Sequence, residues 1–170
     1  FRAFNPALGA TWALSPGLTA YGNASQGNRA PSPIELGCSD PDNPCILPNA
    51  LQADPPLKQV IARSLEAGLR GEALPGWRWN AGVFSTTNRD DILFISNGRA
   101  AGYFANFGKT RRQGVELGLS GRSGAFDAAV HYTRLAATYR SPACLVSQAN
   151  STAGTSSVCT GEDEIEVRSG

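Results

Sequence analysis

The chain has 170 residues, including 19 glycines and 11 prolines but no methionine, and this composition favours one domain-sized unit with many turns over a bundle of long helices. Its formal net charge is +1 and no basic run exceeds the pair Arg111-Arg112, so the electrostatic signature of a nucleic-acid-binding protein is missing and no nucleic-acid partner is expected. No segment approaches the roughly 18 apolar residues of a membrane-spanning helix, whereas a transmembrane β-barrel stays possible because each strand needs only about 9–11 residues of alternating polarity.

The first predicted unit is a β-hairpin. Within residues 5–14, one parity holds the larger apolar side chains and the other the smaller ones, which is the period of a strand; the first set is Leu8, Ala10, Trp12 and Leu14, and the second is Gly9, Thr11 and Ala13. The segment Ser15-Pro16-Gly17 predicts a tight turn, because proline presets the backbone angle and glycine accepts a positive one. Residues 18–28 then form the returning strand. Pro31 and Pro33 prevent the sheet ladder from continuing, and a long loop is expected over residues 31–58.

The second unit begins with residues 59–71, which also alternate in polarity. They are predicted to form a strand, although an amphipathic helix is the alternative because the segment contains good helix formers. Residues 72–76 predict a short turn. Residues 77–95 are then expected to run back as one strand.

The third unit repeats this plan, with a strand over residues 113–121, a turn at 122–125 and a returning strand at 126–139. Phe126 and Val130 share one parity of the last strand, while charged or polar residues such as Asp127 and His131 occupy the other. One face of the sheet is therefore expected to be apolar and the other polar. The segment IEVRSG at 165–170 is a candidate for a further strand.

Connection lengths are the most informative feature of the pattern. Tight turns fall near residues 16, 74 and 123, and long loops are expected at 31–58, 96–110 and 140–164. Short turns at one end and long loops at the other are the plan of an outer-membrane barrel, with apolar side chains toward lipid and polar ones toward the lumen. The predicted fold is therefore an all-β, antiparallel up-and-down meander of six or seven strands, forming part of a large transmembrane β-barrel. A soluble, disulfide-stapled sandwich is the runner-up.

Aromatic residues near the short turns fit the barrel plan. Trp12, Trp79 and Tyr21 lie near the short turns and are predicted to belong to an interfacial aromatic girdle. The alternative is that they are ordinary half-buried strand residues.

The four cysteines fall into two local pairs, Cys38 with Cys45 and Cys144 with Cys159. Four cysteines permit three pairings, and two short loop staples are the simplest of them. The spacing lacks the CxxC pattern of a zinc site, and the single histidine, His131, is distant in sequence, so no metal or other cofactor is predicted. Disulfides imply an oxidising compartment.

Four short motifs, in order, resemble those of TonB-dependent outer-membrane receptors. They are the strand-to-loop sequence SQGNRAPSPIEL, the returning strand LKQVIARSLEAGLRG, the strand WNAGVFSTTNRDDILFI with its Asp-Ile ending, and the segment NFGKTRRQGVELGLSG. Each motif is weak alone, but together they span nearly the whole chain. No segment resembles the family's amino-terminal plug, its TonB-contacting box or its terminal aromatic strand, so residues 1–170 are expected to be a fragment of the barrel.

The resemblance implies a bacterial outer-membrane receptor that imports a scarce nutrient, such as a ferric siderophore or a similar metal chelate. Its implied partners are outer-membrane lipid, the small-molecule ligand and, through the plug of the intact protein, the TonB complex. A passive outer-membrane pore and a surface-loop binding or adhesion module are the alternatives. No nucleophile, base and acid occur in a recognisable order, so no enzymatic activity is predicted.

Cationic and aromatic residues surround the second long loop and would suit an anionic chelate. Alternatively, they are rim residues near lipid headgroups. The candidate ligand-contacting residues are Arg99, Tyr103, Phe104, Lys109, Arg111 and Arg112.

Overall fold

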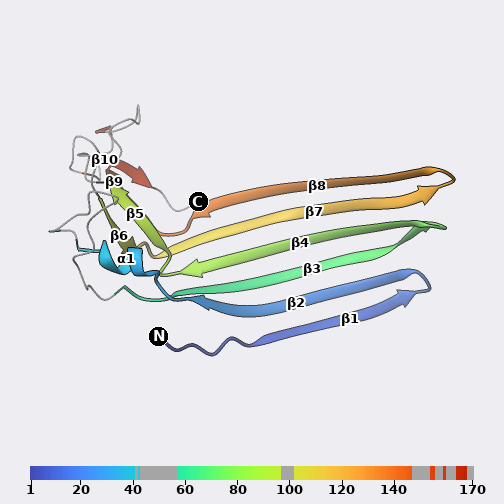
Figure 1. Cartoon of the computed structure of the whole chain (residues 1–170), viewed down its shortest axis with the longest axis horizontal. Helices are drawn as coiled ribbons and strands as arrows, with labels where there is room; N and C mark the ends of the chain where they lie inside the picture. The colour runs from blue at the N-terminus through green and yellow to red at the C-terminus, as the bar shows by residue number, and fades with distance from the viewer. Residues whose placement is uncertain are drawn as a thin grey trace.

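The structure is a computed structural model that describes residues 1–40, 42, 57–96, 102–146, 154–155, 159 and 164–167. One antiparallel sheet of six strands dominates it, in the order β1-β2-β3-β4-β7-β8 (Figure 1). These strands are β1 Ala7–Ser15, β2 Leu18–Arg29, β3 Val60–Leu74, β4 Trp77–Arg89, β7 Lys109–Ser123 and β8 Phe126–Tyr139. The predicted antiparallel meander is confirmed, and residues 59–71 form a strand and not the alternative helix.

The three hairpin turns of this sheet lie at one end and the long connections lie at the other (Figure 1). Each turn contains a glycine with a positive φ, namely 81° at Gly17, 81° at Gly76 and 59° at Gly124. Residues with a Cβ rarely adopt this conformation. The short turns predicted from Pro-Gly and Ser-Gly sequences therefore have a direct conformational cause.

The register of the six strands gives each face of the sheet one predominant kind of side chain. Leu8, Ala24, Leu65 and Ser85 occupy one cross-strand row, and Ala10, Gly22, Ala67 and Val83 occupy the next. We call this side the apolar face; it also carries Trp12, Trp79, Leu117 and Val130. The opposite side, the polar face, carries Tyr21, Glu66, Asn80, Glu116 and His131. The predicted separation of the two faces is confirmed.

The apolar face is uncovered in this chain. Trp12 is 73% exposed, Leu8 79% and Val130 66%. Large apolar side chains at this density on one face are typical of a surface that contacts another apolar phase. Because its large apolar side chains lie on one exposed face, the six-stranded sheet has no hydrophobic core of its own.

Tyr21 is a correction to the predicted aromatic girdle. Its register partners are Thr11 and Gly68, which places it on the polar face. Trp12 and Trp79 do lie on the apolar face, aligned with Ala20 and Gly71. The error has a simple cause: Tyr21 has the opposite parity from the apolar residues of its own strand.

Smaller elements cluster at the loop end of the sheet (Figure 1). They are the helix α1 Pro33–Gly37, the hairpin of β5 Ile92–Ser96 with β6 Gly102–Asn106, and the pair β9 Ala143–Val146 with β10 Glu164–Val167. The short helix lies inside the first predicted loop. The strand predicted at the carboxyl end of the chain exists as β10, but it pairs with β9 outside the main sheet.

The single strand predicted over residues 77–95 is wrong. The chain leaves the main sheet at Asp90, which has a φ of 52°, and β5 pairs with β6 instead. The Asp91 carboxylate fixes this break by accepting hydrogen bonds from the Asn88 amide at 3.2 Å and the Thr110 hydroxyl at 2.5 Å. The predicted loop 96–110 therefore contains a strand of a separate hairpin.

The buried apolar residues of the described chain lie at this loop end. Leu57, Val60 and Ile92 form one cluster, against which Leu36 and Phe104 pack. The Asn106 side chain links the segments on either side of this cluster. Its Oδ1 accepts from the Lys58 N–H at 2.8 Å, and its Nδ2 donates to the carbonyls of Lys58 and Asp90. The hairpin and the start of β3 therefore form one small packed unit above the sheet.

Candidate functional site

The best-defined arrangement on the polar face centres on Tyr21. Its ring extends from β2 across β3, where a Cβ at Gly68 would lie 2.6 Å from the Tyr21 Cζ. Its hydroxyl reaches β4, where a Cβ at Gly82 would lie 2.8 Å from the oxygen. Gly68 and Gly82 are themselves cross-strand partners. The two glycines therefore leave room for the Tyr21 side chain across β3 and β4, and a residue with a Cβ at either position would fill that room. We call this shallow depression the seat of Tyr21.

Two carboxylates flank this seat. Glu66 is paired with Phe84 across β3 and β4, and Glu116 is paired with Gly82 across β4 and β7. Glu116 lies in the same cross-strand row as Tyr21, Glu66 is two residues from Gly68 on β3, and the Arg70 guanidinium carbon lies 5.9 Å from the centre of the Tyr21 ring. Tyr21 therefore lies between two acidic side chains and one basic side chain.

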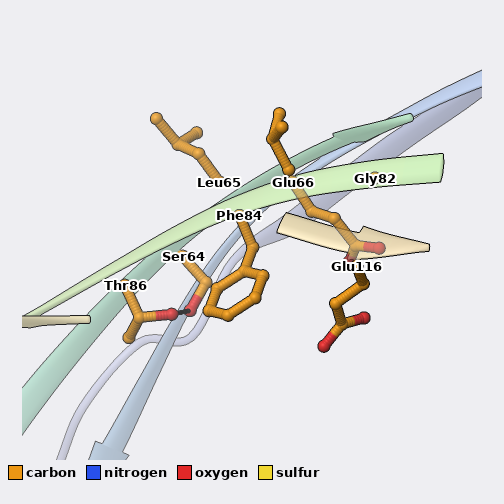
Figure 2. Close-up of a pocket in the computed structure, with 8 residues that line it drawn as sticks. Ser64, Leu65, Glu66, Gly82, Phe84, Thr86 and Glu116 are labelled. Carbon is orange, nitrogen blue, oxygen red and sulfur yellow. Dashed lines mark hydrogen bonds between the residues drawn. The ribbon is translucent and has the colours of Figure 1, made fainter. Parts of the chain in front are cut away.

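A shallow hollow of about 270 Å³ opens beside the two glutamates. Figure 2 shows Ser64, Glu66, Phe84, Thr86 and Glu116 projecting to one side of the strands, whereas Leu65 projects to the other. The hydroxyls of Ser64 and Thr86 are hydrogen-bonded at 2.9 Å. Within the described part of the chain, neither glutamate forms a salt bridge. The hollow therefore combines two carboxylates and a bonded pair of hydroxyls with the apolar side chain of Phe84, and its carboxylates are suited to a cationic or hydrogen-bond-donating group.

Sequence reasoning missed this arrangement. Its signal was available, because glycine at polar-parity positions of two neighbouring strands predicts that a large side chain lies across them. The pattern within one strand does not give the register between strands. That register places Tyr21, Gly68 and Gly82 in one cross-strand row.

The predicted ligand-contacting residues do not form one cluster. Arg112 lies on the polar face, opposite Thr86 and Ala137, whereas Lys109 and Arg111 lie on the apolar face. Alternation along a strand makes this separation unavoidable for consecutive residues. Arg99 lies outside the described residues.

The two aromatic candidates lie in β6. Phe104 packs against the Phe94 ring at a centroid distance of 5.2 Å, and its N–H donates to the Cys38 carbonyl at 2.6 Å. Phe104 is therefore part of the loop-end framework. Tyr103 is paired with Ile95 and is partly exposed. Ligand contact by any of these residues stays a prediction.

Disulfides are present at the loop end. Cys144 is bonded to Cys159, as predicted, with an S–S distance of 2.08 Å. Cys38 is also disulfide-bonded and is only 1% exposed; its predicted partner, Cys45, lies outside the described residues. The first pair joins the start of β9 to the region before β10.

Two other features are absent from the described residues. No three or more His, Cys, Asp and Glu side chains come together in a way that could hold a metal ion. No helix among the described elements has the length and apolar character required to cross a membrane.

The fold and the two faces define a segment of a large antiparallel β-barrel wall with short turns on one side and long loops on the other. The family model of the TonB-dependent receptor-like β-barrel matches residues 1–158. The chain therefore belongs to the TonB-dependent receptor β-barrel family.

A solved structure has a similar fold, the FrpB iron transporter from Neisseria meningitidis, F3-3 variant. The likeness has a TM-score of 0.57 at 23% sequence identity and covers 79% of this chain. The chain spans about a fifth of that transporter's length, since 19% of it is covered. At this identity the likeness concerns the fold alone. No curated protein matches the chain.

Proposed function

We propose that the chain is part of the barrel wall of a bacterial outer-membrane receptor that imports a scarce nutrient with energy passed through TonB. In this arrangement the apolar face contacts lipid and the polar face lines the lumen. The tight turns point to the periplasm and the loop-end elements to the exterior. The observation that carries the proposal is the sorting of side chains between two uncovered faces across six aligned strands.

The same sorting supports transport over enzymatic activity. The polar face offers carboxylates, hydroxyls and amides spread along a wall, and a wall of this kind lines a passage. The acidic hollow at Glu66 and Glu116 is suited to contact a cationic segment of a domain inside the lumen, such as a plug domain. Among the described residues of the polar face, no hydroxyl or thiol nucleophile is hydrogen-bonded to a histidine or lysine base.

The nutrient class we propose is an iron chelate, such as a ferric siderophore. Family membership and the fold shared with a structure described as an iron transporter support this choice. Arg112 and Tyr103 are the predicted ligand-contacting residues that are best placed, because one lies on the polar face and the other is partly exposed in the loop-end hairpin.

Uptake by cells that produce the full-length protein tests the proposal. We expect accumulation of one or more radiolabelled ferric chelates, and loss of that accumulation when TonB is inactivated or the gene is deleted. Uptake that persists without TonB would favour a passive pore. Absence of any uptake, together with adherence to surfaces that depends on the loops, would favour a binding or adhesion module.

A further inference from the structure

The polar face carries two neighbouring arginines at the turn end of the sheet. Arg70 lies opposite Asn80 across β3 and β4, and Arg78 occupies the next row toward the turns, opposite Glu72. The two arginines are therefore diagonal neighbours on adjacent strands, a relationship that places their Cα atoms about 7–8 Å apart. Two arginine side chains at this separation on one face are long enough to contact a single bound group.

Neither guanidinium is neutralised within the described part of the chain, where the two ion pairs involve other arginines. Glu72 lies opposite Arg78, but its carboxylate accepts from the Gly76 N–H at 2.9 Å and is thereby directed toward the turn. The Asp127 carboxylate is bound by Arg122 at 2.9 Å. The hydrogen-bond donors of the two guanidinium groups are therefore available to an external acceptor.

The Tyr21 ring positions Arg70. The Arg70 guanidinium carbon lies 5.9 Å from the centre of that ring, which is a cation–π distance. The ring itself lies in the seat left open by Gly68 and Gly82. This contact involves no oxygen acceptor, so it holds Arg70 in place and leaves its N–H donors free to bind one.

A hollow of about 500 Å³ opens beside the two arginines. Its lining includes, besides the arginines and Glu72, the hydroxyls of Thr19 and Ser120 and the amide of Asn80. Thr19 is the cross-strand partner of Arg70, and Ser120 is that of Arg78. The volume is in the range of small-molecule sites. Two charged and three neutral side chains offer donors to it, so the occupant that fits is a small molecule with anionic oxygens.

We propose that Arg70 and Arg78 form a binding site for the carboxylate groups of a small anionic molecule at the turn end of the polar face. Arginine forks bind carboxylates in a bidentate manner, and the neighbouring hydroxyl and amide groups donate to the remaining oxygens. This inference deepens the proposed function and rests on it in one respect, that the turn end is the periplasmic end of the lumen. The site then holds an anionic cargo at the point where the cargo leaves the lumen.

Charged thiol reagents test the site in the full-length protein, purified in detergent and carrying Ser120→Cys. The probes are an anionic sulfonate and a cationic trimethylammonium methanethiosulfonate, each rate is divided by the rate with a free thiol in solution, and the unsubstituted protein reports any other reactive thiol. We expect the anionic reagent to react faster, and metal-free citrate at constant ionic strength to slow both reactions. Arg70→Gln/Arg78→Gln should lower the anionic-to-cationic rate ratio at least about fivefold and raise the half-protecting citrate concentration at least about tenfold.

Two further variants serve as matched controls. Arg63→Gln/Arg134→Gln removes two cations from the apolar face and should change the rate ratio and the citrate protection less than about twofold. Arg70→Lys/Arg78→Lys keeps both charges but loses the guanidinium forks, so the rate ratio should be retained while citrate protection weakens at least about threefold. This second variant replaces Arg70→Gln/Arg78→Gln if the latter lacks the heat-modifiability of a folded barrel.

Each other outcome overturns the inference. Absence of labelling by either reagent would mean that another part of the full-length protein covers the hollow. A charge preference without citrate protection would indicate a local potential and no binding site, and equal changes in the apolar-face control would indicate a general effect of net charge. Unchanged citrate protection in folded Arg70→Lys/Arg78→Lys would exclude binding by the guanidinium forks. Labelling requires neither TonB nor uptake, so failure of the transport proposal is distinguishable from failure of this site.

Discussion

The hydroxyl of Tyr21 on β2 lies over the backbone of Gly82 on β4, with the whole of β3 between the two residues. A Cβ at residue 82 would stand 2.8 Å from the Tyr21 oxygen but 3.9 Å from Cζ and 3.7 Å from the Ala67 carbonyl oxygen. The close contact therefore involves the hydroxyl alone. This makes the seat of Tyr21 testable by substitution.

We expect Gly82→Ala to destabilise the full-length barrel by about 1 kcal/mol or more, because the added methyl group displaces the Tyr21 hydroxyl. In a Tyr21→Phe background the same substitution should be neutral or stabilising, since alanine restricts the unfolded chain more than glycine does. Urea unfolding in lipid vesicles measures both. An equal loss of stability in both backgrounds would contradict the contact.

A control separates this effect from glycine substitution in general. Gly27 also lies on the polar face, and a Cβ there would meet nothing within 4 Å. Gly27→Ala should therefore leave the free energy of unfolding unchanged or slightly raised.

The meander and its two faces were predictable from sequence because alternation of polarity and Pro-Gly or Ser-Gly turns are local signals. The departure of β5 from the main sheet was not, since it depends on a positive φ at Asp90 and on the contacts that Asp91 makes with Thr110, distant in sequence. The seat of Tyr21 was missed for a related reason. Cross-strand register is a tertiary property, and a shift of one residue would move every side chain to the other face.

A pH-sensitive contact holds α1 to the end of β2. The Glu35 carboxylate accepts from the Arg29 guanidinium at 2.7 and 3.0 Å and from the Ser32 N–H at 2.6 Å. The hydrogen bond from Arg29 is the main cause that holds the pKa of Glu35 below its ordinary value, against the opposing effect of burial. The stabilisation is therefore present above the ordinary pKa of a glutamate and is lost as pH falls through the lowered one.

We expect the protection factors of the Leu36 and Cys38 amides, which donate to the carbonyls of Ser32 and Ile34, to fall as the solution is acidified, each observed exchange rate being compared with the intrinsic rate at the same pH. Glu35→Gln should remove this pH dependence and lower the local opening free energy at neutral pH by about 1 kcal/mol. Asp127→Asn is the matched control, because that carboxylate forms an exposed pair with Arg122 at the turn end. A retained pH dependence in Glu35→Gln would assign it to another group.

Asn106 is expected to organise the loop-end hairpin through its three side-chain hydrogen bonds to the backbone of Lys58 and Asp90. Asn106→Ala leaves those backbone groups without their partner and should cost about 1–3 kcal/mol locally. The readout is faster amide exchange at Lys58, whose N–H loses its acceptor. Asn23→Ala, at an exposed position of the polar face, should leave exchange at Lys58 unchanged, and unchanged exchange in Asn106→Ala itself would contradict the role.

The loop cysteines are expected to form two separate staples in exported protein. Non-reducing peptide mapping should recover Cys144 linked to Cys159 and Cys38 linked to Cys45. Replacing Cys144 and Cys159 together with serine should lower the stability of the loop by about 2–3 kcal/mol, because the disulfide no longer restricts the unfolded chain. The measurement is faster limited proteolysis between β9 and β10. A Cys38–Cys144 crosslink, or four free thiols, would show the predicted pairing to be wrong.

The orientation of the sheet in the membrane can be tested at two consecutive residues of β8. Val130 is 66% exposed on the apolar face, aligned with Leu119, whereas Ala129 is aligned with Ser120 on the polar face. Arginine facing lipid near the bilayer midplane costs about 2–4 kcal/mol in barrels, while the lumen tolerates charge. We therefore expect Val130→Arg in the full-length protein to lower its unfolding free energy in vesicles by that amount and to reduce its assembly into the outer membrane. Ala129→Arg changes the same strand by the same side chain and should assemble normally. Equal effects of the two substitutions, or a larger effect of Ala129→Arg, would mean that the apolar face does not contact lipid.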